Sequence, residues 1–119
     1  MTGSSQPPLP DGIRPGEVVI VHCQAPREKM WGLLLRLDGV GLALRGMMLD
    51  SVEDWLRQEA SEQDATIGPS TVFLPMHRVQ RVDLDEQCGP VESLQERYRQ
   101  MCGRAVGEVL AGGDSRGGL

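Results

Sequence analysis

Three consecutive stretches in the first half of the chain have the hydrophobic pattern of β-strands. Residues 17–23 (EVVIVHC) are β-branched and apolar on both faces as far as His22. Residues 29–38 and 40–49 alternate leucine with polar or small residues, which is typical of strands with one buried face. Asp38-Gly39 between them is a strong tight-turn signal. We therefore expect three antiparallel strands that follow one another along the chain.

A second group of strands is predicted in the stretch STVFLPMHRVQRVDLDE, residues 70–86. Its first half is β-branched, aromatic and apolar up to Pro75, which removes a backbone donor and ends the run. In its second half, Val82 and Leu84 face one side, and Arg81 and Asp83 face the other. Two short strands joined by a tight turn follow from this pattern, and such a kinked pair commonly closes a small barrel.

Two helices are expected outside the strands. Ser51 to Asp54 has the form of a capping box, which predicts a short helix over residues 51–60. After Pro90, apolar residues recur at helical spacing and predict one amphipathic C-terminal helix over residues 90–110. Gly103 and Gly107 weaken its second half, so that the helix either frays beyond Cys102 or packs closely against a neighbour.

The 119 residues have room for one core. Residues 1–16 hold four prolines among glycine, serine and threonine, and we expect a disordered arm there; residues 112–119 are glycine-rich and are expected to form a disordered tail. The fold prediction is therefore a mostly β domain over residues 17–111. It consists of a five-stranded small barrel with an inserted helix and a C-terminal helix.

Charge and cysteine content narrow the classes of partner. The net charge is −5, and residues 17–86 hold 7 Lys or Arg against 12 Asp or Glu, so the acidity belongs to the domain itself. An acidic surface disfavours non-specific binding to nucleic acid, and the few aromatic residues provide no platform for stacking bases. Three widely spaced cysteines and the lack of a long apolar run predict a soluble, cytoplasmic protein without a membrane span.

The spacing of small and apolar residues resembles the Sm-like small β-barrels. Gly32, Leu34, Leu37 and Asp38 stand in the spacing G-x-L-x-x-L-D of the first Sm motif, and Leu42 and Leu44 in its following L-x-L. Val79 and Val82 are similar to the V-x-x-V that ends the second motif. The resemblance covers about 70 residues and implies a strongly bent five-strand barrel of the Sm-like or SH3-like kind. It also implies a ring of several copies, with RNA as a candidate partner.

The same comparison gives the candidate ligand site. His77 and Arg78 lie in the turn between the last two strands, which faces the central pore in Sm-like rings, and there they would bind the phosphate of RNA or of a nucleotide end. Gly41 is the third candidate, because it stands where the family usually carries an RNA-contacting asparagine. The second motif's usual Arg-Gly is Pro75-Met76 here. The alternative is that Arg78 pairs with an acidic neighbour such as Asp83, and that His77 caps the turn.

A second candidate surface is the apolar face of the C-terminal helix. Leu94, Tyr98 and Met101 on that helix, or Trp31 on the second strand with Met47 and Met48, are candidates for contact with another copy. The alternative is that Leu94, Tyr98 and Met101 cover the open end of their own barrel. Edge strands that need covering or pairing favour a homo-oligomer.

We expect no catalytic residue, metal site or cofactor. His22 and Cys23 are neighbours in a strand, so they point to opposite faces and cannot share a proton. The three cysteines lack metal-ligand spacing, and Asp83, Asp85 and Glu86 fit a solvated strand end. The sequence therefore predicts a non-catalytic oligomeric binding or scaffold protein, with RNA binding by a ring or a protein interaction module without nucleic acid as alternatives.

Overall fold

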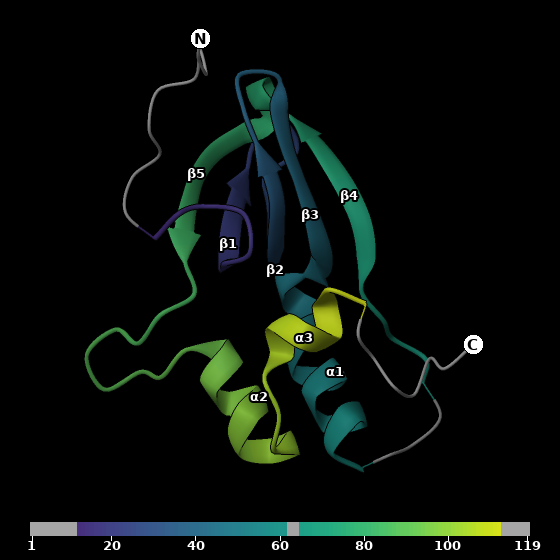
Figure 1. Ribbon diagram of the computed structural model, residues 1–119. Helices are drawn as coiled ribbons and strands as arrows, with labels where there is room; N and C mark the ends of the chain where they lie inside the picture. Colours follow the sequence, from purple (N-terminus) through teal and green to yellow (C-terminus); the bar gives the residue numbers. More distant parts are fainter. Residues whose placement is uncertain (1–11, 62–64, 113–119) are drawn as a thin grey trace, which may run out of the picture.

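The computed structural model describes residues 12–61 and 65–112, which form a five-stranded antiparallel sheet with helices packed at one end (Figure 1). The elements, in chain order, are β1 (Val18–Cys23), β2 (Glu28–Leu37), β3 (Gly41–Met48), α1 (Leu49–Ser61), β4 (Ser70–Pro75), the 3-10 turn η1 (Met76–Arg78), β5 (Val79–Leu84), α2 (Leu94–Cys102) and α3 (Val106–Leu110). All five predicted strands are confirmed.

The strands are ordered β4-β3-β2-β1-β5, so the last two strands of the chain lie at opposite edges of the sheet. In the described residues β4 pairs only with β3, and β5 pairs only with β1. The sheet is therefore open, and the predicted closed barrel is not formed by backbone pairing. The η1 turn connects the two edge strands and is hydrogen-bonded to the β2–β3 turn through Met76 N and Val40 O, 2.9 Å apart.

Both faces of the sheet carry buried side chains, because neighbouring residues of a strand point to opposite faces and belong to two separate hydrophobic cores. The inner core lies within the curve of the sheet and consists of Val19, Val21, Cys23, Met30, Leu34, Leu42, Leu44 and Leu74. The outer core joins the sheet to the helices and includes Val18, Trp31, Leu33, Met47, Val52, Trp55, Leu56, Tyr98, Val106, Val109 and Leu110. This arrangement explains why the first strand is apolar on both faces.

A pair of glycines allows β2 and β3 to approach closely. Gly32 lies directly opposite Gly46 in the register of the two strands. A Cβ on Gly46 would lie 2.0 Å from the carbonyl oxygen of Trp31, and a Cβ on Gly32 would lie 2.4 Å from that of Arg45. No side chain fits at either position, so these glycines are required by the close contact between the strands.

Both predicted helices differ from the structure at their ends. Helix α1 begins at Leu49, directly after β3, so Ser51 lies inside its first turn and is not the N-cap. The predicted single helix over residues 90–110 is wrong: Gly103 adopts φ +79 and ends α2, and α3 begins at Val106. Glycine is the residue that most readily takes this left-handed conformation, which is why the chain breaks there.

Helix α2 is fixed to the sheet by Asp85, a buried carboxylate at the end of β5. Its Oδ1 accepts from Leu94 N at 2.9 Å, and its Oδ2 accepts from Gln95 N at 2.8 Å and from Trp31 Nε1 at 3.1 Å. Ser93 caps the same helix by accepting from Glu96 N. One carboxylate thus satisfies two free amides of the helix and the indole of the core.

Replacing Asp85 with alanine is expected to lower the free energy of unfolding by about 2–4 kcal/mol, because it leaves one buried and two partly buried donors without an acceptor. Urea unfolding measures this loss. Asp54→Ala is the matched control: its carboxylate is exposed on α1 and, among the described residues, pairs only with Arg57, so the loss is expected to stay below about 1 kcal/mol. Equal losses in the two variants would contradict the anchoring role.

The predicted arm and tail lie mostly outside the described residues, in 1–11 and 113–119. The part of the arm that the structure describes packs onto the sheet: Gly16 N donates to Leu34 O at 2.8 Å, and Ile13 packs against the inner core. Among the described residues, no helix has both the length and the apolar character that crossing a bilayer requires.

Candidate functional site

The candidate ligand turn, η1, is fastened to the turn between β1 and β2 by Arg78. The guanidinium donates from Nε to Gln24 O at 2.9 Å and from Nη2 to Pro26 O at 3.0 Å, and it forms an ion pair with Glu28 at 2.8 Å. Gln24 also donates two hydrogen bonds to η1. Its side chain donates to His77 O at 3.0 Å, and its backbone N–H donates to Arg78 O. The Arg78 side chain is only 20% exposed, which is consistent with a structural role in linking the two turns.

The structure places the other two candidate ligand residues close to Arg78 in the fold but in different environments. Gly41 is buried opposite Pro75, and a Cβ there would lie 2.3 Å from Leu74 O, so this glycine has a packing role. The side chain of His77 is exposed. Only His77 therefore presents a free side chain to a ligand, and ligand binding at this turn stays a prediction.

The acidic partner of Arg78 is Glu28, not Asp83. Asp83 instead bonds to two side chains, Arg81 Nε and His22 Nε2, each at 2.8 Å. Partial burial acts to raise the pKa of the Asp83 carboxyl, but the hydrogen bonds from Arg81 and His22 outweigh it and hold that pKa below its usual range. The contact between His22 and Asp83 connects β1 and β5, whereas Arg81 and Asp83 both lie on β5; the pair of Arg78 and Glu28 connects η1 and β2.

Replacing Arg78 with glutamine is expected to lower the free energy of unfolding by about 1–3 kcal/mol, because Glu28 and two backbone carbonyls lose a charged donor. Urea unfolding gives the value. Arg81→Gln is the control, since Arg81 is mostly exposed and its one ion pair within the described part of the chain is with Asp83; a loss below about 1 kcal/mol is expected. If the Arg78 variant were as stable as the natural chain, the guanidinium of Arg78 would instead be available to bind a ligand.

The four candidate interface residues do not form one surface. Trp31 and Tyr98 are fully buried in the outer core, where both contact Trp55: the ring centroids are 5.9 Å apart for Trp31 and 5.2 Å for Tyr98. Leu94 is partly buried against the same core, and Met101 is 40% exposed. The helix thus covers its own sheet, as the alternative interpretation expected, and only Met101 is broadly accessible.

Tyr98 also belongs to a polar cluster that the sequence analysis missed. Its hydroxyl donates to Glu59 Oε1 at 2.8 Å, and Arg104 Nη2 lies 3.2 Å from the same oxygen. Burial, together with the nearby carboxylate, raises the pKa of the Tyr98 hydroxyl well above its ordinary value. Glu59 lies on the apolar face of α1 at helical spacing from Trp55 and Leu56, which is the signal that marks it as an inward-facing carboxylate.

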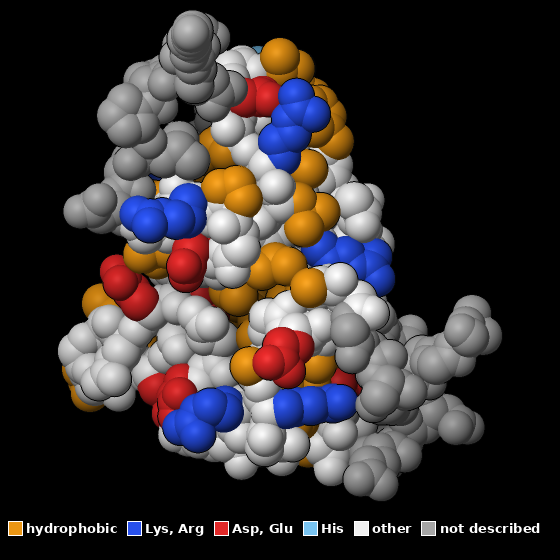
Figure 2. Space-filling view, in the orientation of Figure 1, with side chains coloured by type: hydrophobic (Ala, Val, Ile, Leu, Met, Phe, Trp, Pro, Cys, Tyr) orange, Lys and Arg blue, Asp and Glu red, His pale blue; other side chains and the backbone are white. Residues whose placement is uncertain are grey.

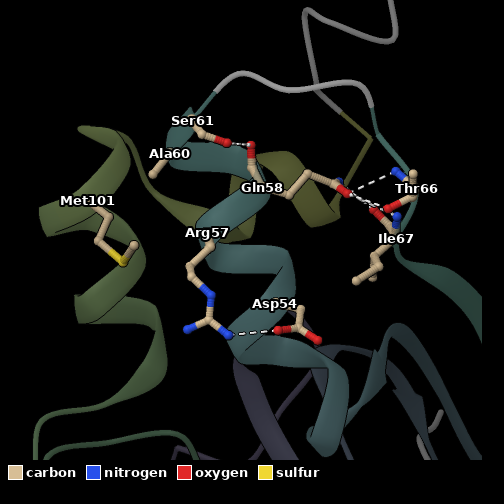
Figure 3. Close-up of a pocket in the computed structure, with 8 residues that line it drawn as sticks. All are labelled: Asp54, Arg57, Gln58, Ala60, Ser61, Thr66, Ile67 and Met101. Atoms are coloured by element: carbon tan, nitrogen blue, oxygen red, sulfur yellow. Dashed lines mark hydrogen bonds and ion pairs between the residues drawn. The ribbon is translucent and has the colours of Figure 1, made fainter.

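A hollow of about 780 Å³ lies beside α1 and α2 (Figure 3). Its lining consists of Asp54, Arg57, Gln58, Ala60, Ser61, Thr66, Ile67 and Met101. Gln58 binds the segment before β4, accepting from Thr66 N at 2.8 Å and donating to Ile67 O at 2.7 Å, while Arg57 pairs with Asp54. Because these polar groups bind one another or the backbone, the hollow is explained by the way α1 holds this segment.

The outer edge of β4 is one of the two sheet edges that have no strand partner among the described residues; the outer edge of β5 is the other. The strand consists of Ser70–Pro75 and carries no charged residue. Leu74 points into the inner core, whereas Phe73 is 54% exposed and lies over Gly41. The alternation in STVFLP is the sequence signal for this outward Phe73.

Groups with catalytic or metal-binding chemistry are dispersed. His22 bonds to Asp83, while Cys23 is buried in the inner core, where burial raises the pKa of its thiol. The two neighbours therefore do not share a proton, as predicted from their positions in a strand. Within residues 12–61 and 65–112, no three His, Cys, Asp or Glu side chains are grouped so as to hold a metal ion.

Comparison with known proteins gives no match: no family model, no curated protein and no solved structure is significantly similar to this chain.

Proposed function

We propose that this protein is a non-catalytic, self-associating binding or scaffold domain, and that copies join through the edge of β4. The observation that carries the proposal is the unpaired and uncharged edge strand with its exposed Phe73. A free edge presents a row of backbone donors and acceptors that a strand of another chain can satisfy.

The composition of β4 is what distinguishes it from a protected edge. Proteins usually shield edge strands with charges, bulges or proline, because an unprotected edge invites pairing. β5 follows this rule, since it carries Arg81 and Asp83 along its length. β4 has β-branched, apolar and hydroxyl side chains and reaches proline only at its last residue, so it is suited to pairing.

An apolar patch lies beside this edge and would add contact area. Phe73 on β4, Leu35 on β2 and Val40 in the β2–β3 turn are large hydrophobic side chains that remain exposed. Hydrophobic side chains are gathered over β2, β3 and β4 on the face shown in Figure 2. Exposed apolar patches of this kind are typical of contact surfaces between proteins.

The strand order and the 3-10 turn between the two edge strands support the finer interpretation as an Sm-like or SH3-like small barrel. In such a barrel, pairing of β4 with β5 of the next copy builds a ring, whereas β4 with β4 gives a two-fold dimer. RNA binding by a ring is the alternative function. The internal contacts of Arg78 weaken it, because they occupy most of the donors that would contact phosphate.

The test is the solution mass by light scattering, measured over a concentration series for the natural chain and two variants. Phe73→Lys places a charge on the β4 edge, and Met101→Lys places the same charge on the exposed face of α2. We expect the natural chain and Met101→Lys to be oligomeric and Phe73→Lys to be monomeric. Circular dichroism checks that each variant is folded.

Four outcomes are distinguished by this design. A dimer that Phe73→Lys dissociates indicates β4–β4 pairing, and a larger closed mass indicates β4–β5 pairing. Dissociation by Met101→Lys alone would overturn the proposal in favour of the helix face. A natural chain that is monomeric at every concentration would also overturn it.

A further inference from the structure

The end of the sheet where β1, β2 and β5 meet holds a small cavity of about 310 Å³. Its lining consists of His22, Cys23, Arg27, Glu28, Lys29 and Gln80. The cavity is separate from the β4 edge, since none of these residues belongs to β3 or β4. Its lining holds Arg27 and Lys29 against one carboxylate, Glu28, in a chain whose net charge is −5.

The register of the strands places three basic side chains in one row. His22 lies opposite Lys29 on β2 and opposite Arg81 on β5, so all three project from the same face of the sheet. Like charges that face each other across strands destabilise a sheet. The Asp83 carboxylate hydrogen-bonds to both Arg81 and His22. Lys29 is then the residue of this row that has no carboxylate partner among the described residues.

The charge balance within the cavity is positive. Glu28 is its one carboxylate, and that charge is matched by Arg78 at 2.8 Å. Arg27 and Lys29 have no ion pair or side-chain hydrogen bond among the described residues. Two cations therefore line a cavity together with the amide of Gln80 and the ring of His22, and no resident anion compensates them.

We propose that this cavity binds a tetrahedral phosphate dianion, either inorganic phosphate or the phosphate group of a small ester, through Arg27 and Lys29. An arginine fork and a lysine point charge are the groups that proteins use for phosphate. Gln80 supplies a neutral donor to the same anion. The volume, about 310 Å³, is at the small end of the range for ligand sites and suits a phosphate group rather than a large ligand.

The test is isothermal titration of the full chain with inorganic phosphate, adenosine 5′-monophosphate and adenosine at low ionic strength. Variants Arg27→Gln/Lys29→Gln and Arg57→Gln are compared with the natural chain; Arg57 is an exposed arginine on α1, remote in sequence from the cavity. We expect the double variant to bind phosphate at least about tenfold more weakly and Arg57→Gln to bind as the natural chain does. Adenosine, which lacks the phosphate, is expected not to bind.

The two phosphate sources are distinguished by their affinities: equal affinities indicate a site for free phosphate, and tighter binding of the monophosphate indicates an ester. A thermal shift provides a second readout, because Lys29 has no ion pair or side-chain hydrogen bond among the described residues and its removal should not unfold the chain. Phosphate is expected to raise the melting temperature of the natural chain but not that of the double variant. Equal binding or equal shifts in both proteins, or no binding to the natural chain, would overturn the proposal.

Discussion

Gly46→Ala is expected to lower the free energy of unfolding by about 3 kcal/mol or more, the largest loss that any small substitution should cause in this fold. The added Cβ would lie 2.0 Å from the carbonyl oxygen of Trp31 and 2.6 Å from the Cα of Gly32. Both atoms belong to the backbone of β2, and they cannot move without breaking the ladder between β2 and β3. Urea unfolding, followed by circular dichroism, measures the loss.

Gly107→Ala is the matched control for this substitution. Gly107 lies in α3, and a Cβ there would meet no atom within 4 Å, so alanine is expected to be neutral or to stabilise by up to about 1 kcal/mol. Gly103 would not serve, because its φ of +79 disfavours any side chain. If Gly46→Ala were as stable as Gly107→Ala, β2 and β3 would not be in the close contact described above.

Trp55→Ala is expected to lower the free energy of unfolding by about 3–5 kcal/mol. Trp55 is fully buried on α1 between two other rings, with Tyr98 stacked at an interplanar angle of 17° and Trp31 tilted at 53°. Its removal leaves a cavity at the point where β2, α1 and α2 meet, so the helices lose their shared contact with the sheet. Chemical denaturation gives the size of the loss.

The same experiment tests whether the helices belong to their own sheet. When the core lies within one chain, the loss caused by Trp55→Ala is the same at low and high protein concentration. Met101→Ala, at a largely exposed position of α2, is expected to cost less than about 1 kcal/mol. A loss for Trp55→Ala that varies with protein concentration would place α2 against another copy and contradict the fold.

Local pattern was sufficient to predict the strands, because alternation and β-branching are properties of neighbouring residues. The bounds predicted for the first strand, residues 17–23, differ by one residue from those of β1, Val18–Cys23. The helix ends were harder to predict. The segment from Ser51 to Asp54 has the residue types of a capping box. However, β3 continues directly into α1, which begins two residues before Ser51. No local sequence signal marks such a continuous transition.

The candidate site depended on contacts between residues far apart in the chain. Arg78 forms an ion pair with Glu28, which lies 50 positions away in the chain, because β5 pairs with β1. The sequence suggested the nearer Asp83 as its acidic partner. Trp31 and Tyr98 were interface candidates because they are apolar residues on the second strand and on the C-terminal helix. The helices cover one face of the sheet, so both rings lie in the core, and Phe73 is the aromatic residue that stays exposed.

The most direct test of pairing at β4 is amide hydrogen exchange of this strand, compared between dilute and concentrated solutions of the natural chain. β2 serves as an internal reference, because it has a hydrogen-bonded neighbour on each side at any concentration. We expect the exchange of β4 to slow markedly in the concentrated solution, while β2 is equally protected in both. Equal exchange of β4 at both concentrations, in a sample shown to be oligomeric, would contradict the account.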